Sequence, residues 1–251
     1  MSVAALSADH LAPARAVVPT HEDAWLGIDR LIAQAHPKGR YKVLEAGGGS
    51  LTALGALARA DVTVIDISPE QLARNAYADT RLEGDLQTFE AYPERYDVIV
   101  CRDVLEHLEQ PQAALQRLLA VLAPGGILVI GGPAPTSFKG LLTKFSPHGV
   151  HVAYYRWIIG EKNAGKPGYA PFKAFMSMSI RPAALKRTAA RAGLGCVYEA
   201  LTPPSWMLQR MAAVSPLLPA AYNAAMAVLR ALSFGTWRPD LSDMVLAFRA
   251  R

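Results

Sequence analysis

The sequence predicts an α/β fold built on an open, mostly parallel sheet. Two runs of apolar, β-forming residues support this: residues 43–46 break into three glycines, and residues 62–65 end at a carboxylate, Asp66. Helical patterns alternate with such runs along the first half of the chain, as parallel strands joined by crossover helices require. The chain has 251 residues and no internal repeat, so we expect one domain with a full hydrophobic core.

The expected elements begin with an arm and a helix. Residues 1–20 are rich in alanine and proline and are expected to be loosely held, whereas residues 22–35 carry an apolar stripe at helical spacing. The glycine segment is expected to lead into a helix through residues 54–58. A serine cap followed by proline predicts a second helix over 68–76. Residues 96–101 are nearly all apolar, as in a strand that is buried on both faces.

Further along the chain, a first insertion interrupts the regular order. A helix over 111–122 stops at a Pro-Gly-Gly sequence, and a strand over 127–130 follows. Residues 132–180 show no regular pattern and are too long for a plain connection. They are therefore predicted to form a lid or substrate-recognition insertion, after which a helix is expected over 182–192.

A second insertion, over 203–240, separates the last two expected strands, 196–201 and 244–249. Residues 211–229 contain no charged side chain. Two prolines and much alanine within them argue against a membrane span, so we expect a helical hairpin that covers the active site. Three flanking arginines leave two alternatives open, a contact with a membrane surface and plain core packing.

The glycine segment differs from two common phosphate-binding loops. A dinucleotide loop needs a third glycine where this chain has Thr52, and the Gly-Lys-Ser/Thr sequence of a P-loop does not follow. Carboxylates stand instead at Glu45, Asp66 and Asp85. They would repel phosphates but suit an amine, a ribose diol, an adenine amino group and a nearby sulfonium. The predicted ligand is a nucleoside without a pyrophosphate.

Five motifs in order resemble those of the class I S-adenosylmethionine-dependent methyltransferases, in particular the methyltransferase-11 and ubiquinone-biosynthesis-like group. They are residues 44–49 (LEAGGG), 64–68 (VIDIS), 84–86 (GDL), 96–100 (YDVIV) and 122–130 (LAPGGILVI). The resemblance implies a Rossmann-like sheet of seven strands, mostly parallel with an antiparallel last strand, and helical insertions. It also implies S-adenosylmethionine as the cofactor.

The resemblance assigns roles to individual residues. Glu45 and Gly47 would face the methionine moiety, Asp66 the ribose hydroxyls and Asp85 the adenine. The full set of implied cofactor-binding residues is Glu45, Ala46, Gly47, Gly49, Asp66, Ile67, Asp85, Leu86 and Arg102. The single domain, 1–251, would comprise an N-terminal arm and helix, a cofactor-binding half, a substrate or lid insertion and a helical insertion, over residues 1–40, 41–131, 132–180 and 203–240.

Composition suggests a setting and a kind of partner. Cys101 and Cys196 lie in apolar contexts without metal-type spacing, which predicts buried thiols in a reducing compartment. No secretory signal is apparent, so the expected localisation is cytoplasmic, with membrane association left open. Residues 1–131 hold 11 Lys/Arg and 17 Asp/Glu, a net charge of −6, whereas residues 132–251 hold 15 and 4, a net charge of +11. The basic half predicts an anionic substrate, lipid surface or nucleic acid as partner, unless it is only a solvated face.

The loop after the expected strand 96–101 holds the preferred catalytic residue. In open α/β sheets such loops border the ligand. Methyl transfer from a sulfonium is an in-line displacement, so the protein must align the nucleophile and, for a hydroxyl, remove its proton. His107 is the preferred general base because the ordinary pKa of histidine lies near neutrality. The alternative is that Glu106 and His107 only hold the loop or cap a helix.

A metal site is a second interpretation of this loop. Asp103, Glu106 and His107 stand at positions i, i+3 and i+4, which share one face of a helix. The spacing is similar to the acid-x-x-Glu-His pattern of metal-assisted O-methyltransferases of ubiquinone biosynthesis and of small-RNA 3′ ends, although those enzymes carry Glu in place of Asp103. A divalent ion there, with His148 or His151 as a further ligand, would lower the pKa of a hydroxyl. Metal-free methyltransferases share Leu-Glu-His at this place, so we predict no metal site here and keep the divalent ion as an alternative.

Residues 138–157 interleave cations with aromatic side chains and include His148 and His151, which join His107 as catalytic candidates. Such a segment suits an anionic substrate with a flat or apolar part, single-stranded RNA, or simply a small core of the insertion. We therefore predict O-methylation of a partly apolar, anionic or lipid-linked small molecule. The alternatives are an RNA methyltransferase, a non-methylating scaffold or cyclase that binds S-adenosylmethionine, and a peripheral membrane enzyme.

Overall fold

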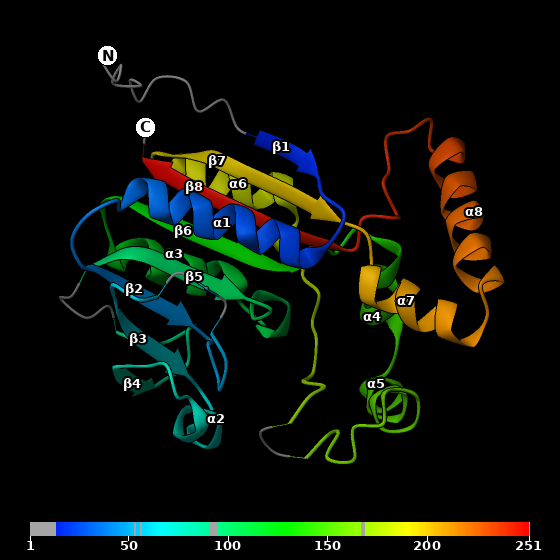
Figure 1. The fold of residues 1–251 in the computed structure, drawn as a ribbon, viewed down its shortest axis with the longest axis horizontal. Helices are drawn as coiled ribbons and strands as arrows, with labels where there is room; N and C mark the ends of the chain where they lie inside the picture. The colour runs from blue at the N-terminus through cyan, green and yellow to red at the C-terminus, as the bar shows by residue number, and fades with distance from the viewer. Residues whose placement is uncertain (1–13, 53, 56, 91–94, 167–168, 251) are drawn as a thin grey trace.

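The computed structural model describes residues 14–52, 54–55, 57–90, 95–166 and 169–250. Its strands are β1 (Ala14–Val17), β2 (Tyr41–Ala46), β3 (Ala60–Asp66), β4 (Thr80–Glu83), β5 (Tyr96–Arg102), β6 (Leu122–Pro133), β7 (Leu194–Thr202) and β8 (Asp243–Ala250). They form one sheet in the order β1-β7-β8-β6-β5-β2-β3-β4, in which only β8 is antiparallel to its neighbours (Figure 1). The expected mostly parallel sheet with an antiparallel last strand is confirmed.

The sheet has one strand more than the seven expected. β1 comes from the segment that was predicted to be a loose arm, and it pairs parallel to β7 with Ala14 opposite Tyr198. The N–H of Val18 continues the pairing by donating to the carbonyl of Leu201 at 3.1 Å. The prediction of a loose arm is therefore wrong for residues 14–17, and residues 1–13 lie outside the described residues.

Helices pack on both faces of the sheet and make two hydrophobic cores. The helices are α1 (His21–Ala35), α2 (Pro69–Arg74), α3 (Pro111–Val121), α4 (Phe138–Phe145), α5 (His148–Tyr154), α6 (Pro182–Arg191), α7 (Ser205–Val214) and α8 (Leu217–Leu232). Trp25 and Ile28 of α1 pack on one face, and Leu115 of α3 and Leu185 of α6 pack on the other (Figure 1). Strands buried on both faces are apolar at nearly every position, which is why their sequences showed no alternation.

The helices predicted over 22–35, 68–76, 111–122 and 182–192 are confirmed as α1, α2, α3 and α6, within two residues at each end. The helix predicted through residues 54–58 is wrong, because the described residues between 47 and 59 contain none. Side chains take the backbone N–H groups that a helix would use there. Thr52 Oγ1 accepts from Leu54 at 3.2 Å, and the Asp29 carboxylate accepts from Gly55 at 3.1 Å.

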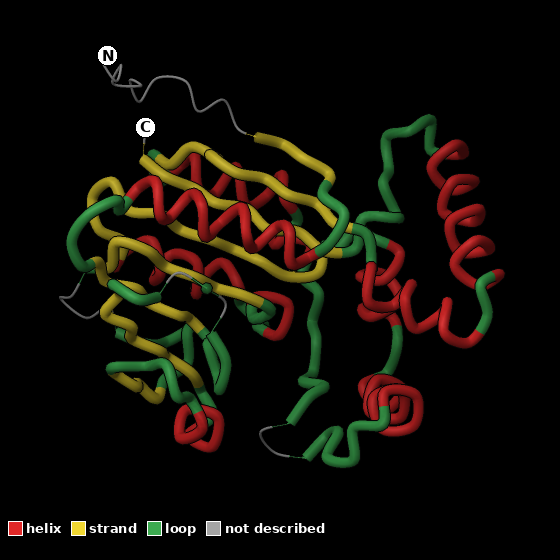
Figure 2. Tube along the Cα trace, viewed as in Figure 1, coloured by secondary structure: helices red, strands yellow, loops and turns green. Residues whose placement is uncertain are grey.

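Both insertions lie beyond the carboxyl ends of the parallel strands, at the right-hand end of Figure 1. The first contains α4, α5 and a π-helical turn, Tyr155–Ile159, and returns to the sheet through a long loop (Figure 2). The second contains α7 and α8, which confirms the predicted pair of helices. The ring of Phe138 on α4 meets the ring of Tyr222 on α8, with their centroids 6.3 Å apart. No helix within the described ranges combines the length and the apolar character needed to cross a membrane.

The prediction of buried thiols is confirmed for Cys101 but not for Cys196. Cys101 is buried in β5 and Cys196 is half-buried in β7, and neither forms a disulfide. Burial, and then the nearby carboxylates of Glu106 and Asp103, raise the pKa of the Cys101 thiol. Cys101 is therefore protonated at neutral pH and acts as a small apolar side chain.

Candidate active site

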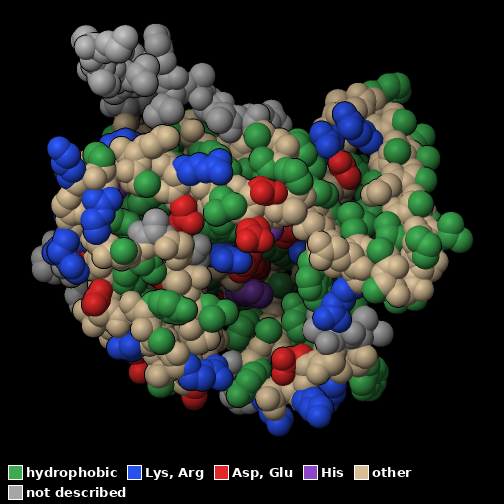
Figure 3. Space-filling model, viewed as in Figure 1, with side chains coloured by type: hydrophobic (Ala, Val, Ile, Leu, Met, Phe, Trp, Pro, Cys, Tyr) green, Lys and Arg blue, Asp and Glu red, His purple; other side chains and the backbone are tan. Residues whose placement is uncertain are grey.

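A pocket of about 310 Å³ opens at the carboxyl ends of β2 and β5, where ligands bind in open α/β sheets. Figure 3 shows a hollow near the middle of this side of the molecule, where acidic side chains and a histidine gather. The lining residues are Glu45, Ala46, Gly47, Gly48, Gly49, Ser50, Leu51, Thr52, Gln71, Val100, Arg102, Asp103 and Phe172. The glycine segment therefore forms one wall of the pocket, as predicted from the sequence.

The glycines allow the loop to turn tightly against neighbouring side chains. Gly47 has a φ of 72°, and a Cβ at this position would stand 2.4 Å from a methyl carbon of Val104. Gly49 has a φ of 53°, and its Cβ would stand 2.3 Å from Oε1 of Gln71. Gly47 therefore needs both the left-handed backbone and the missing Cβ, whereas at Gly49 the left-handed backbone is the main requirement, because the Gln71 side chain can move away.

Asp66 holds the glycine loop in place. Its carboxylate accepts hydrogen bonds from the backbone N–H of Gly49 at 2.9 Å and of Ser68 at 2.8 Å. Asn75, which is buried, donates from Nδ2 to the carbonyl of Gly49 at 2.9 Å. Each carboxylate oxygen has two lone pairs, so Asp66 can still accept from a diol that is placed over the loop.

The other acidic residues take different positions. Glu45 is buried and accepts a hydrogen bond from the Thr52 hydroxyl, which fixes its carboxylate at the base of the pocket. Asp85 is half-buried after β4 and accepts from the backbone N–H of Gln87 at 2.8 Å. Leu86 lies in the core at 4% exposure, whereas Ile67 is 70% exposed. Asp85, Ile67 and Leu86 do not line the pocket as it stands.

Arg102 and Asp103 close the pocket from β5. The Arg102 guanidinium lies over the ring of Trp25, 5.1 Å from the centroid, and its Nε is 3.3 Å from Oδ2 of Asp103. Asp103 has a φ of 54°, an uncommon backbone conformation that aspartate tolerates better than most residues. Its N–H donates to the carbonyl of Gly131 at 3.0 Å.

His107 is held in one tautomer. It lies in a single 3₁₀ turn, Leu105–His107, with its Nδ1 2.8 Å from the carbonyl oxygen of Lys173. A carbonyl only accepts, so Nδ1 carries the proton and Nε2 of the neutral ring is left as an acceptor. Burial lowers the pKa of His107, and the nearby charge of His148 lowers it further, against the raising effect of the Lys173 carbonyl and Asp103. The ring also meets the pocket residue Phe172 edge-on, with centroids 5.9 Å apart.

Glu106 is buried beside His107. Burial raises its pKa to about 8, and the charge of Asp103 contributes to the increase. Its Oε1 is 3.8 Å from Nε2 of His107, and its backbone carbonyl accepts from Phe175 at 2.7 Å. The loop that returns from the first insertion is therefore anchored at both Glu106 and His107.

Asp103, Glu106 and His107 do not fit a metal ion. The spacing argument assumed a helix, but only residues 105–107 are helical and Asp103 precedes them in a left-handed conformation. Within the part of the chain that the structure describes, no three His, Cys, Asp or Glu side chains converge as metal ligands would. Since Asp103 does not share a helical face with Glu106 and His107, the arrangement that suggested a divalent ion is not realised in the fold.

His148 and His151 lie on α5, and their ring centroids are 6.4 Å apart. His148 is exposed and close enough to affect the pKa of His107, and burial lowers the pKa of His151. The pocket lining includes neither histidine and no residue of α7 or α8 in the described chain. The prediction that the second insertion covers the site is therefore wrong for this pocket, since that insertion lies beside α4.

Sequence reasoning missed three residues that shape the site. Phe172 lies in a segment with no periodic pattern, and Gln71 looks like an ordinary exposed position of a helix. Asn75 follows α2, where an asparagine normally suggests only a helix end. Its two further bonds, in which Oδ1 accepts from the N–H groups of Tyr77 and Ala78, appear only in the folded chain.

Comparison with known families identifies the fold and the chemistry. A methyltransferase domain family matches residues 21–199, more than half of the chain, including β2, β3, β5 and the pocket loop. The chain belongs to this methyltransferase family. It is a class I S-adenosylmethionine-dependent methyltransferase, and the resemblance inferred from the five sequence motifs is confirmed.

Relatives of this methyltransferase include enzymes named for ubiquinone biosynthesis. It is 29% identical over 206 residues to the ubiquinone biosynthesis O-methyltransferase of Azoarcus sp., a match that covers 76% of this chain and 82% of that protein. It is 35% identical over 113 residues to the mitochondrial ubiquinone biosynthesis O-methyltransferase of Schizosaccharomyces pombe. The second match covers only 41% of each chain.

Solved structures share the fold of this methyltransferase at lower identity. The magnesium protoporphyrin IX methyltransferase of Synechocystis, solved with bound S-adenosylhomocysteine, is 17% identical with a TM-score of 0.54, covering 92% of this chain and 84% of that one. The 4+2 cyclase SpnF is 18% identical with a TM-score of 0.51, covering 89% and 80%. The residues present here fit the cofactor, because the glycine loop and the carboxylates of Glu45 and Asp103 line the pocket, and the Asp66 carboxylate accepts a hydrogen bond from Gly49 of that loop.

Proposed function

We propose that this methyltransferase transfers the methyl group to a hydroxyl oxygen of a partly apolar, anionic small molecule, of which a lipid-linked metabolite is one form. The observation that carries the proposal is the fixed tautomer of His107. A base for a hydroxyl must present an unprotonated nitrogen at neutral pH, and the Lys173 carbonyl leaves Nε2 in that form. The names of the O-methyltransferase relatives support oxygen as the acceptor atom.

On this proposal, the cofactor lies along the carboxyl ends of β2 and β3. The backbone of the glycine loop and the carboxylate of Glu45 receive the methionine part, and Asp66 receives the ribose hydroxyls. Asp85, with Ile67 beside it at the rim, receives the adenine. When bound, S-adenosylmethionine supplies a methyl group that is already activated on a sulfonium.

The chain contributes alignment and a proton acceptor. The acceptor hydroxyl lies near Asp103 and His107, and its proton passes to Nε2 of His107 as the oxygen takes the methyl group. Phe172 and the returning loop exclude water from this edge of the pocket, because that loop is hydrogen-bonded to both Glu106 and His107. The first insertion, with His148 and His151 on α5, provides the side of the site where a basic, aromatic-rich surface meets the acceptor.

The test uses radiolabelled S-adenosylmethionine and a set of phenols and carboxylated phenols with and without an alkyl chain. Wild type is compared with His107→Gln and with the control His36→Gln, which changes a half-buried histidine stacked on Tyr41, a contact outside the pocket. Product that depends on the acceptor hydroxyl, and is lost only in the His107 variant, supports the proposal. Equal turnover by both variants excludes His107 as the base.

A further inference from the structure

The second insertion exposes an apolar surface. On α8, Leu217, Val228 and Leu232 are 75%, 57% and 72% exposed. Together with Ala221 and Ala224, they recur every three or four residues, which places all five on one side of the helix. We call these five residues the α8 stripe. Its length and purely apolar composition distinguish it from the single exposed hydrophobic residues that are ordinary on protein surfaces.

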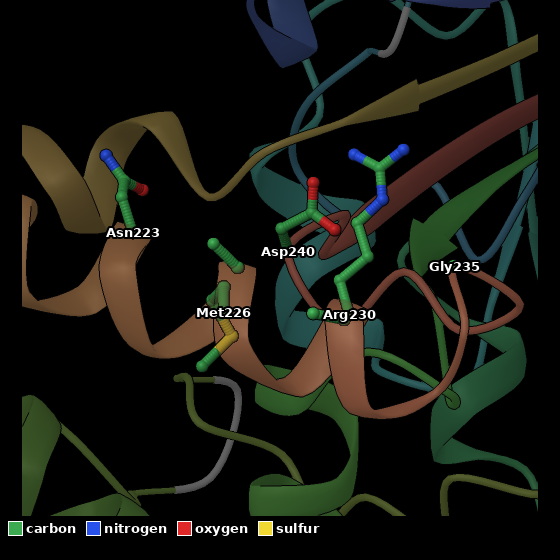
Figure 4. Close-up of a pocket in the computed structure, with 7 residues that line it drawn as sticks. Asn223, Met226, Arg230, Gly235 and Asp240 are labelled. Carbon is green, nitrogen blue, oxygen red and sulfur yellow. The ribbon is translucent and has the colours of Figure 1, made fainter.

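The inner side of α8 holds the only charged residue of the helix. Met226 is buried, and the ring of Tyr222 meets Phe138 of α4. Arg230 extends beside Asp240 and lines a pocket of about 430 Å³ between α8 and the loop that follows it (Figure 4). A helix that faces water normally has its polar side outward. In α8 the single charged side chain, Arg230, is exposed but extends along the side that faces Asp240, and the opposite side of the helix is apolar, as expected of a helix that contacts an apolar phase.

The neighbouring helix has the composition of a membrane–water boundary. Trp206, Arg210 and Val214 follow one another at intervals of four on the exposed side of α7. The Arg210 guanidinium lies over the Trp206 ring, 4.6 Å from its centroid. Tryptophan and arginine side chains have an apolar body and a polar end, which suits the headgroup level of a bilayer. Phe234, just after α8, is 95% exposed and continues the apolar surface.

The charge around the α8 stripe distinguishes between two possible partners, a second copy of the chain and a lipid membrane. Residues 203–239 contain three arginines and no acidic residue, and residues 132–160 of the adjoining insertion contain three further Lys/Arg and no acidic residue. A symmetric dimer through the α8 stripe would place each cationic insertion against the same insertion of the second copy. Anionic lipid headgroups instead complement this charge.

We infer that the α7–α8 insertion docks on the surface of an anionic lipid membrane, with the α8 stripe at the boundary between headgroups and acyl chains. α8 has 16 residues and is about 24 Å long, less than the ~30 Å hydrocarbon core, so it lies along the surface. The inference goes beyond the proposed function and does not depend on which acceptor is methylated.

The test is flotation of the full chain with vesicles of phosphatidylcholine alone or with added phosphatidylglycerol. Wild type is expected to float with the anionic vesicles only. The triple variant Leu217→Gln, Val228→Gln, Leu232→Gln is expected to lower the bound fraction at least about tenfold. The matched control Leu26→Gln changes an exposed leucine of α1 and should float like wild type. Failure of wild type to float, or unchanged flotation of the triple variant, overturns the inference.

Two further measurements separate the remaining explanations. Arg210→Gln is expected to weaken binding to anionic vesicles about fivefold, whereas Lys38→Gln, an exposed cation next to α1, should leave it unchanged. Sedimentation velocity without lipid is expected to give the same mass for wild type and the triple variant. A wild-type dimer that the triple variant dissociates would make the stripe an interface between copies and overturn the inference. Unchanged binding of S-adenosylmethionine by each variant verifies that it is folded.

Discussion

Replacing Asp66 by asparagine tests whether its carboxylate organises the glycine loop. The carboxylate accepts from Gly49 and Ser68 at 2.9 and 2.8 Å, and asparagine would put an N–H₂ donor against one of these donors. A hydrogen bond to a charged group is worth about 1.5–3 kcal/mol, so the free energy of unfolding should fall by about that amount. The loop that it holds lines the pocket in which we propose that the cofactor binds, so affinity for S-adenosylmethionine should fall about tenfold to a hundredfold, or about 1.4–2.8 kcal/mol.

Asp79 provides a matched control, because its carboxylate binds the opposite end of β3 from Asp66. The Asp79 carboxylate accepts from the N–H of Val62 at 2.8 Å but is not part of the pocket. Asp79→Asn should lower stability in urea unfolding and leave the calorimetric affinity for S-adenosylmethionine unchanged. The reasoning is refuted if Asp66→Asn binds the cofactor within twofold of wild type, or if Asp79→Asn weakens binding equally.

Three more outcomes follow from individual side chains. His107→Gln should lower kcat by about 10²- to 10⁴-fold without changing cofactor affinity. The wild-type rate should fall only as pH drops below 6.5, because the pKa of His107 is lowered. A pH–rate profile of each protein checks both outcomes. The wild-type protein should lose stability as pH rises from 4.5 to about 8, because folded Glu106 keeps a proton that the unfolded chain releases. Glu106→Gln should lack this loss, which urea unfolding at pH 5 and pH 8.5 checks. Asn75→Ala should lower the unfolding free energy by about 3 kcal/mol, since it removes three hydrogen bonds, two of them buried, and a change below 1 kcal/mol would contradict the role given to Asn75.

The sequence was informative where local chemistry decides structure. Apolar runs that end in glycine or aspartate predicted β2, β3 and the position of the pocket. A strand that is buried on both faces must be apolar, whereas the end that contacts a ligand needs glycine or polar residues. Helix caps and stops predicted α2 and α3. All of these are properties of neighbouring residues along the chain.

The errors occurred where distant residues decide structure. The segment after the glycine loop has helix-forming residues, but the acceptors on Asp29 and Thr52 take N–H groups that a helix would need. β1 has four residues and exists because β7, about 180 positions later, offers it an edge. The spacing of Asp103, Glu106 and His107 suggested a metal site only if the segment were helical. The left-handed conformation of Asp103 ahead of a short turn cannot be predicted from composition.

Such distant contacts concentrate at the edge of the pocket formed by Asp103, Glu106 and His107. The φ of 54° at Asp103 costs on the order of 1 kcal/mol, and it persists because the N–H of Asp103 is bound to the carbonyl of Gly131. His107 takes its tautomer from Lys173, 66 residues away in sequence, and Glu106 binds the same returning loop through Phe175. Replacement of that loop would therefore change both the shape of the acceptor side and the proton acceptor itself. On the proposed mechanism, acceptor choice and base strength would be coupled through one insertion, while the glycine loop and Asp66 on the other side of the pocket could stay the same.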